Sequence, residues 1–186
     1  MKLRETDLAG VVIVELDDFT DDRGSFMETY DAKAFAKLGV TTAFVQDSCS
    51  VSRRKGTVRG LHFQTAPRAQ DKLVRVTRGR LFDVMVDLRP ASPNYKRWMG
   101  LELSAHDRFQ VLIPKGFAHG FCTLEANTEI TYKMSDHFSL GHYAGVRWND
   151  PDLAIDWPVA EAEAVLSERD KQLPLLRELP PVNPFE

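Results

Sequence analysis

Short apolar runs separated by clusters of turn-forming residues dominate the chain. Most are too short for a helix and end at glycine, aspartate, serine or proline, as strands commonly do. Such runs fall within residues 11–19, 42–52, 57–64, 71–89, 99–105, 108–125 and 129–138. Eight or more strands at this spacing, with few helices between them, predict a mainly β protein built as an antiparallel barrel or jelly roll.

The run 71–89 contains two strand patterns joined at Arg78 and Gly79, and this junction predicts a β-hairpin. In the second pattern Asp83 and Asp87 alternate with apolar residues. Alternation of this kind predicts a strand with one face on the core and the other in solvent.

Helical periodicity is confined to two places. Apolar residues in 31–39 recur at a spacing near 3.6, and Gly39 suits the position just beyond a helix end, so a helix is predicted there. The tail, 159–186, predicts a short helix followed by a proline-rich end. No repeat, low-complexity segment or linker is apparent, so we expect residues 1–186 to form one domain.

Composition narrows the function classes. The 186 residues carry a net charge of −3, which gives no basic excess for nucleic-acid binding. No apolar run approaches the roughly 20 residues of a membrane helix, and the N-terminus has no apolar core of a secretory signal. Cys49 and Cys122 are the two cysteines and form no CxxC pair, so we expect a cytoplasmic protein without structural disulfides.

Two histidines lie inside apolar strand-like runs, His62 in "VRGLHFQ" and His119 in "IPKGFAHGF". The second stretch resembles the PxGxxH motif of the cupin jelly roll, in which the histidine points into the barrel. The first stretch lacks the HxH and following glutamate of metal-binding cupins. Since catalytic metal sites usually have at least three protein ligands, we expect no metal here. Two hydrogen-bonded core histidines are the alternative.

Further polar side chains occur on strands that should otherwise face the core. Arg59 precedes His62, Lys72 begins "KLVRV", and Tyr132 and Lys133 follow "EIT". A charge facing a barrel interior is costly unless it is paired or meets a ligand. Strand alternation puts Tyr132 and Lys133 on opposite faces, and we expect Lys133 to point outward.

In combination these motifs closely resemble one family. "DDRGSFMETY", "FVQDSCS", "RGLHFQ", "QDKLVRVTRGRLFDVMVDLR", "IPKGFAHGF", "ITYK", "WNDPDLAIDWP" and "LSERDKQLPLL" occur in the order typical of dTDP-4-dehydrorhamnose 3,5-epimerases, over roughly residues 8 to 176. The resemblance implies a cupin-type jelly roll. It also implies a homodimer that epimerises C3 and C5 of a dTDP-linked 4-keto-6-deoxyhexose, with no cofactor.

The resemblance assigns catalytic roles to four residues. His62 matches the base that removes a proton next to the C4 ketone, and Asp170 matches the carboxylate that orients this histidine. Lys72 matches the lysine near the C4 oxygen, and Tyr132 matches the proton donor on the opposite face of the sugar ring. Without the resemblance, Asp170 would be predicted as a surface residue at a helix end.

It also assigns substrate-binding residues. Arg23 and Glu28 match nucleotide contacts made across a dimer interface, and Phe26 matches a further substrate contact. Gln46, Asp47 and Ser48 match a strand that lines the nucleotide pocket. The remaining matches to substrate contacts are Arg59, Lys72, His119, Phe138, Tyr143 and Arg169.

The chain departs from the family pattern in "DHFSLGHYAGVRWND". Phe138 stands where the family usually has tyrosine, Leu140 replaces proline, and Tyr143 replaces a glutamate. Because this loop is expected to border the sugar pocket, a single-centre epimerase of another deoxysugar pathway is an alternative. Alternatives of other classes are a metal-dependent cupin and a non-catalytic binder of sugar nucleotides.

Overall fold

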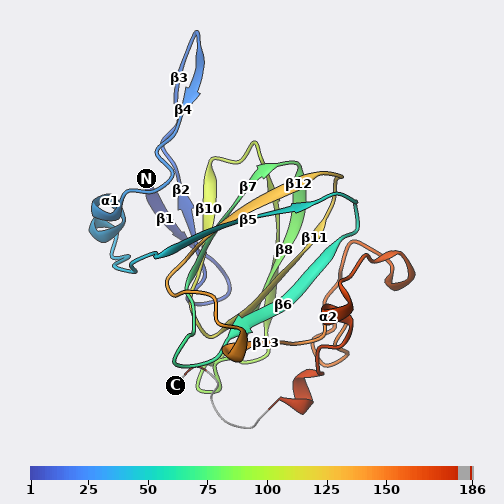
Figure 1. The fold of residues 1–186 in the computed structure, drawn as a ribbon. Helices are drawn as coiled ribbons and strands as arrows, with labels where there is room; N and C mark the ends of the chain where they lie inside the picture. Colours follow the sequence, from blue (N-terminus) through green and yellow to red (C-terminus); the bar gives the residue numbers. More distant parts are fainter. Residues whose placement is uncertain (180–184, 186) are drawn as a thin grey trace.

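Two antiparallel sheets face each other in the computed structural model, which describes residues 1–179 and 185 (Figure 1). The six-stranded sheet has the order β1 (Lys2–Glu5), β2 (Val12–Glu15), β10 (Phe109–Ile113), β7 (Lys72–Arg78), β12 (Thr128–Met134) and β5 (Gln46–Ser52). The five-stranded sheet has the order β13 (Tyr143–Gly145), β6 (Val58–Gln64), β11 (Phe117–Thr123), β8 (Arg80–Asp87) and β9 (Trp98–Ser104). The predicted mainly β jelly roll is confirmed.

The main core lies between the two sheets. It contains Val74 and Val76 of β7, Ile130 of β12, and Leu81 and Met85 of β8, all buried. Burial of a side chain of this size contributes about 1.5–3 kcal/mol, so this layer is a major source of stability. The apolar core fills one part of the space between the sheets and leaves the part between β5 and β6 for polar side chains.

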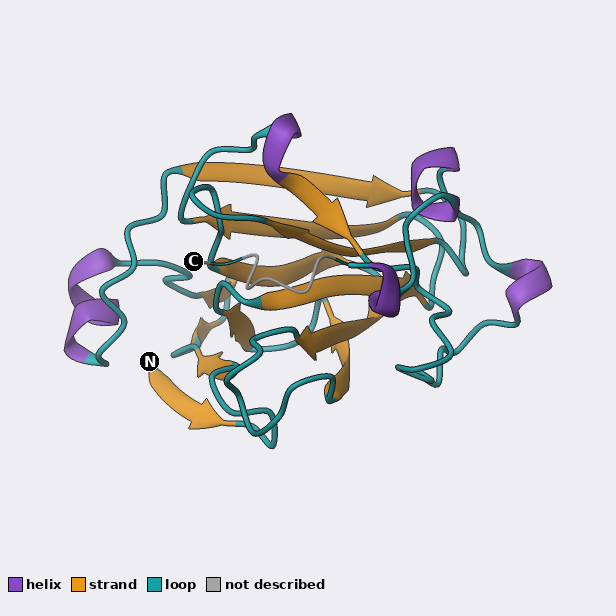
Figure 2. Cartoon of the chain, turned by 90° about the horizontal axis from the view of Figure 1, so that it is seen from below, coloured by secondary structure: helices purple, strands orange, loops and turns teal. Residues whose placement is uncertain are grey.

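Helix α1 (Ala32–Lys37) covers the outer face of the six-stranded sheet and confirms the helix predicted in 31–39. Asp31 caps its N-terminus, where the side chain accepts a 2.6 Å hydrogen bond from the backbone N–H of Ala34. Phe35 is buried against Val14 and Leu73. The other helical segments are short and lie outside the strand layers (Figure 2): α2 (Glu168–Lys171) and the 3₁₀ turns η1 (Leu140–His142), η2 (Glu161–Glu163) and η3 (Leu176–Glu178).

The hairpin predicted around Arg78 and Gly79 is wrong. Strand β7 belongs to the six-stranded sheet and β8 to the five-stranded sheet, so the chain passes from one sheet to the other at this point. Gly79 has φ +73°, and a Cβ there would lie 2.6 Å from Oγ1 of Thr128. A glycine with positive φ suits a sharp corner between sheets as well as it suits a hairpin turn.

The half-exposed strand predicted at Asp83 and Asp87 is also wrong, because β8 is buried on both faces. Both carboxylates are 0% exposed and lie on the inner face with Met85. Val84 and Val86 form the outer face, which the C-terminal segment covers through Leu153 and Leu176. Alternation of polar and apolar residues indicates that the two faces of a strand differ, but it does not show which face is exposed to solvent.

A two-stranded hairpin projects from the sandwich (Figure 1) and was not predicted. It consists of β3 (Phe19–Asp21) and β4 (Gly24–Phe26), with Phe19 64% and Phe26 67% exposed. Strands β1 and β13 were not predicted either. The strand predicted within residues 11–19 is present as β2, which pairs with both β1 and β10 of the same chain.

The C-terminal tail agrees in part with its prediction. The short helix is present as α2, whereas most of the proline-rich end, residues 180–184 and 186, lies outside the described residues. None of the helices within the described part of the chain is long and apolar enough to span a membrane.

Candidate active site

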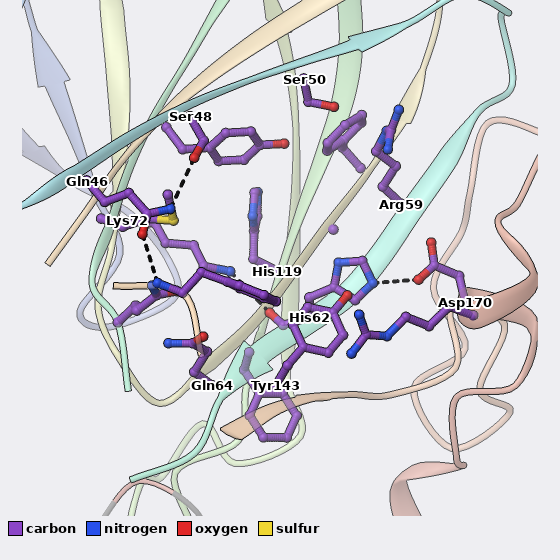
Figure 3. Close-up of a pocket in the computed structure, with 18 of the residues that line it drawn as sticks. Gln46, Ser48, Ser50, Arg59, His62, Gln64, Lys72, His119, Tyr143 and Asp170 are labelled. Atoms are coloured by element: carbon purple, nitrogen blue, oxygen red, sulfur yellow. Dashed lines mark hydrogen bonds and ion pairs between the residues drawn. The ribbon is translucent and has the colours of Figure 1, made fainter. Parts of the chain in front are cut away.

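A cavity of about 390 Å³ opens between β5 and β12 of one sheet and β6 and β11 of the other (Figure 3). Segments distant in sequence meet there, since α2 and the loop before β13 close one side. The lining residues are Gln46, Ser48, Ser50, Arg59, His62, Phe63, Gln64, Gln70, Lys72, His119, Gly120, Phe121, Tyr132, Met134, Phe138, Tyr143, Ser167, Arg169 and Asp170.

The shape of β6 explains how Arg59 and His62 both reach this cavity. Residues three apart on a regular strand lie on opposite faces. Gly60 interrupts the alternation with φ +120°, and the pairing of β6 with β11 shifts register between His119 and Phe121. A Cβ on Gly60 would lie 2.6 Å from the Cα of Gly120, so both glycines are needed for the close approach.

His62 and Asp170 form a hydrogen-bonded pair at the cavity wall (Figure 3), with 2.6 Å between Nε2 and Oδ1. Asp170 is buried, at 4% exposed, and the Ser167 hydroxyl accepts a hydrogen bond from its backbone N–H. A carboxylate only accepts, so Nε2 carries the proton and Nδ1 presents a lone pair. Burial lowers the pKa of His62, although Asp170 opposes this by stabilising the cation.

Lys72 stands at the start of β7, where its Nζ donates to the backbone oxygen of His62 at 3.3 Å. Burial lowers the pKa of Lys72 to about 8, while the negative charge of Asp83 acts in the opposite direction. The ammonium form therefore predominates at neutral pH and places a positive charge beside His62.

Tyr132 of β12 lines the same cavity, and its neighbour Lys133 lies on the opposite face of the strand, as predicted. Burial, reinforced by the charge of Asp83, raises the pKa of Tyr132, so its hydroxyl keeps the proton. Lys133 instead pairs with Asp47 at 2.8 Å. Tyr132 is thus a protonated phenol within the cavity that can act as an acid.

A second buried histidine–aspartate pair joins β11 to β8. Nε2 of His119 lies 2.7 Å from Oδ1 of Asp83, and both side chains are almost completely buried. The sequence interpretation included His119 but missed Asp83, which it placed on a solvent face. The sequence did contain a signal for Asp83, because it is a charged residue within a strand and its sequence neighbours are apolar.

The predicted binding residues divide into two groups. The cavity brings together Gln46, Ser48, Arg59, Lys72, His119, Phe138, Tyr143 and Arg169. It does not include Asp47, which lies on the other face of β5, nor Arg23, Phe26 and Glu28, which belong to the projecting hairpin or follow it. Lining residues missed by sequence reasoning include Ser50, Gln64, Gln70, Met134 and Ser167.

The loop that departs from the family pattern forms an aromatic wall. Cζ of Arg169 lies 3.7 Å from the centroid of the Tyr143 ring, and the His62 ring centroid lies 5.0 Å from it. Phe138 contacts Tyr143 edge-on at 5.7 Å. Tyr143 therefore holds the Arg169 guanidinium over the face of its ring, beside the His62–Asp170 pair.

The described residues contain no group of three or more histidine, cysteine, aspartate or glutamate side chains placed to hold a metal ion. Arg59 and Arg169 give the cavity two guanidinium groups, which suit a phosphate ligand. The cavity therefore combines a neutral imidazole, an ammonium, a protonated phenol and an anion-binding side.

The pKa directions predict a bell-shaped dependence of catalysis on pH. To accept a proton, His62 must be neutral, and burial lowers its pKa from the ordinary value of about 6.5, so the neutral form predominates at neutral pH. Lys72 must be protonated, and this form is lost as the pH rises through about 8. A pH profile of kcat/KM should therefore plateau between these limits, and Lys72→Met should abolish the fall at high pH. A rate that keeps rising above pH 9 would contradict this assignment.

Comparison with known proteins places this geometry in one family. The model of the dTDP-4-dehydrorhamnose 3,5-epimerase family matches residues 5–178. A dTDP-4-dehydrorhamnose 3,5-epimerase of Sinorhizobium fredii is 47% identical over 180 residues, covering 97% of this chain and 92% of the relative.

Solved structures agree. The Bacillus anthracis dTDP-4-dehydrorhamnose 3,5-epimerase with TDP and PPi bound has a TM-score of 0.90 and 50% identity, covering 94% of this chain and 99% of that one. The Legionella pneumophila dTDP-6-deoxy-D-glucose-3,5-epimerase in complex with dTDP-4-keto-L-rhamnose has a TM-score of 0.90 and 40% identity, with coverage of 96% and 94%.

Proposed function

The chain belongs to the dTDP-4-dehydrorhamnose 3,5-epimerase family, and from this premise we propose that it converts dTDP-4-keto-6-deoxyglucose to dTDP-4-keto-L-rhamnose by inverting C3 and C5. One observation carries the assignment to this cavity. The His62–Asp170 pair faces the same space as the Lys72 ammonium and the Tyr132 hydroxyl.

The first step is removal of a proton from a carbon next to the C4 ketone. Nδ1 of His62 accepts this proton, and Asp170 stabilises the imidazolium that forms. The electron pair of the broken C–H bond moves into the ring and leaves an enolate with its charge on the C4 oxygen. Lys72, which lines the cavity, stabilises this charge with its ammonium group.

The second step returns a proton to the opposite face of the same carbon. Tyr132 donates its hydroxyl proton and the enolate collapses to the ketone. The resulting phenolate then recovers a proton from solvent, and the His62 imidazolium releases its extra proton to solvent. The raised pKa of Tyr132 keeps its hydroxyl protonated until the enolate forms, and the phenolate left after the transfer readily takes a proton back. Repetition at the second carbon completes the double epimerisation.

Substrate binding is assigned to the polar and aromatic rim. Arg59 and Arg169 can each give paired hydrogen bonds to the diphosphate. Gln46 and Ser48 of β5 provide polar contacts, and Gln46 also fixes Phe138 by accepting a 2.8 Å hydrogen bond from its backbone N–H. This arrangement gives Phe138 a defined position as a flat surface for the nucleotide base.

We assign Arg23, Phe26 and Glu28 to the active site of a second copy of the chain. They lie on or just after the projecting hairpin and take no part in the cavity of their own chain. Phe19 and Phe26 leave apolar surface on both of its strands, which a monomer has no reason to expose. A homodimer that exchanges hairpins would bring these residues to the partner's nucleotide.

Mixing of inactive variants tests this arrangement. His62→Ala and Arg23→Ala should each have low activity as pure dimers. After subunit exchange, half of the dimers are mixed, and one of their two sites has an intact cavity and an intact hairpin. Activity should therefore return to about a quarter of wild type. A mixture of His62→Ala with Asp170→Asn is the control and should recover nothing, because both changes lie in the cavity. Equal results for the two mixtures would contradict a shared site.

The function itself is tested by product stereochemistry. Incubation with dTDP-4-keto-6-deoxyglucose should give dTDP-4-keto-L-rhamnose, identified by NMR of the isolated product. Inversion at one carbon alone would identify a single-centre epimerase, the alternative suggested by Phe138, Leu140 and Tyr143. Unchanged substrate under conditions in which the protein is folded would refute the proposal.

A further inference from the structure

Asp83 occupies a position where the fold gains little from a carboxylate. It is 0% exposed on the inner face of β8, and the neighbouring inner-face residues Leu81 and Met85 belong to the apolar core. Burying a carboxylate in such a place costs several kcal/mol unless its oxygens are well compensated. Only Oδ1 is bonded, to His119, while Oδ2 has no hydrogen-bond partner among the described residues.

Asp87, four positions further along β8 and on the same face, shows what a structural carboxylate looks like on this strand. It is equally buried, but both of its oxygens are bonded: they accept hydrogen bonds from Arg89, and Oδ2 also accepts one from Ser92. Asp87 thus secures the turn after β8. The incomplete bonding of Asp83 calls for a different explanation, because a purely structural site would favour either full pairing or an apolar residue.

The surroundings of Asp83 connect it to the reacting groups. Its charge acts on both Lys72 and Tyr132, raising the pKa of each. Through Oδ1 it also holds His119, whose ring meets the Tyr132 ring edge-on at 6.2 Å. Since a carboxylate can only accept, Nε2 of His119 carries the proton and Nδ1 is left for a ligand in the cavity.

We infer that Asp83 is a positioning residue of the epimerisation, which fixes the tautomer of His119 and maintains the ammonium of Lys72 and the hydroxyl of Tyr132. The inference rests on the proposed function, because it assigns Lys72 and Tyr132 to the enolate and its reprotonation. Asp83 itself lines no part of the cavity and acts through these neighbours.

The other charged or titratable groups around Lys72 do not replace Asp83. Lys72 shares the cavity with Arg59, His62, His119, Tyr132, Tyr143, Arg169 and Asp170. Among these, Asp170 is the other carboxylate, and it is committed to His62 at 2.6 Å. The positive charges of the arginines and of any protonated histidine would destabilise the ammonium form of Lys72. Asp83 is therefore the group whose removal should be felt most by Lys72.

The test compares Asp83→Asn with Asp87→Asn, a matched loss of one buried carboxylate on the same strand. In Asp83→Asn, kcat should fall by about tenfold or more. The high-pH limb of kcat/KM should also move down by about half a pH unit or more, because Lys72 loses its supporting charge. Asp87→Asn should lower Tm and leave this limb where it is in wild type. Asp83→Glu, which keeps the charge, should return the high-pH limb of kcat/KM to its wild-type position.

Titration of Lys72 by NMR of ¹³C-methylated protein gives a second reading that needs no substrate. Its pKa should fall in Asp83→Asn and stay unchanged in Asp87→Asn, so this result is separate from any failure of the proposed reaction. Asp83→Ser serves in the same assay if Asp83→Asn does not fold. A Lys72 titration or a high-pH limb that is unaltered by loss of the Asp83 charge would overturn the inference, as would an equal shift in Asp87→Asn.

Discussion

Asp170→Asn is expected to lower kcat by about 10⁴-fold while leaving the fold intact, as loss of the orienting carboxylate does in comparable histidine sites. In the present structure Asp170 both fixes the proton of His62 on Nε2 and stabilises the imidazolium. Asparagine keeps the size of the side chain but removes the charge. Its amide can also present N–H to Nε2, which would transfer the ring proton to Nδ1, the atom assigned as base.

Steady-state turnover and thermal melting of the same preparations check this expectation. Glu168→Gln is the matched control, because Glu168 belongs to the same helix but is 82% exposed and pairs with Lys171. It should turn over at the wild-type rate. An Asp170→Asn variant within tenfold of wild type would show that His62 does not depend on this carboxylate.

The second large effect is expected for Tyr132→Phe, which removes one hydroxyl and leaves the ring in contact with His119. Product formation should fall by about 10²–10³-fold, since the enolate loses its proton donor. Exchange of the first proton with solvent should decrease much less, because His62 can still remove and return it on the same face.

Measuring both rates on one sample separates these roles. In heavy water, Tyr132→Phe should incorporate deuterium into recovered substrate faster than it forms inverted product. Tyr95→Phe provides a control at a tyrosine 41% exposed and outside the cavity. Equal loss of exchange and inversion would assign Tyr132 to the first step instead.

Several features of the fold could be predicted from local pattern, because they depend on it. The helix after Asp31 has a capping side chain, a buried Phe35 and a terminal glycine close together in sequence. The opposite faces of Tyr132 and Lys133 follow from strand geometry alone. The same reasoning failed at Gly79 and at β8, since the partner of a strand and the layer that covers it are decided by segments far away.

In the candidate site, too, some features follow from local sequence pattern and others depend on segments far apart in the chain. His62 and Asp170 lie 108 positions apart and meet only after α2 folds against β6, so no local pattern could join them. Resemblance to a family supplied that pairing. Neither local pattern nor family resemblance identified Asp83, because alternation predicted that it faces solvent and no short motif contains it. Asp47 shows the converse: its sequence neighbours line the cavity, yet strand alternation turns it to the other face.

Deuterium incorporation by the wild-type protein tests the central claim most directly. The protein is incubated with dTDP-4-keto-6-deoxyglucose in heavy water, and the product is examined by NMR at C3 and C5. Proton abstraction beside the C4 ketone at both centres predicts deuterium at both carbons of an inverted product, with none at C2. The absence of deuterium from C3 and C5 while active substrate is present would contradict the account.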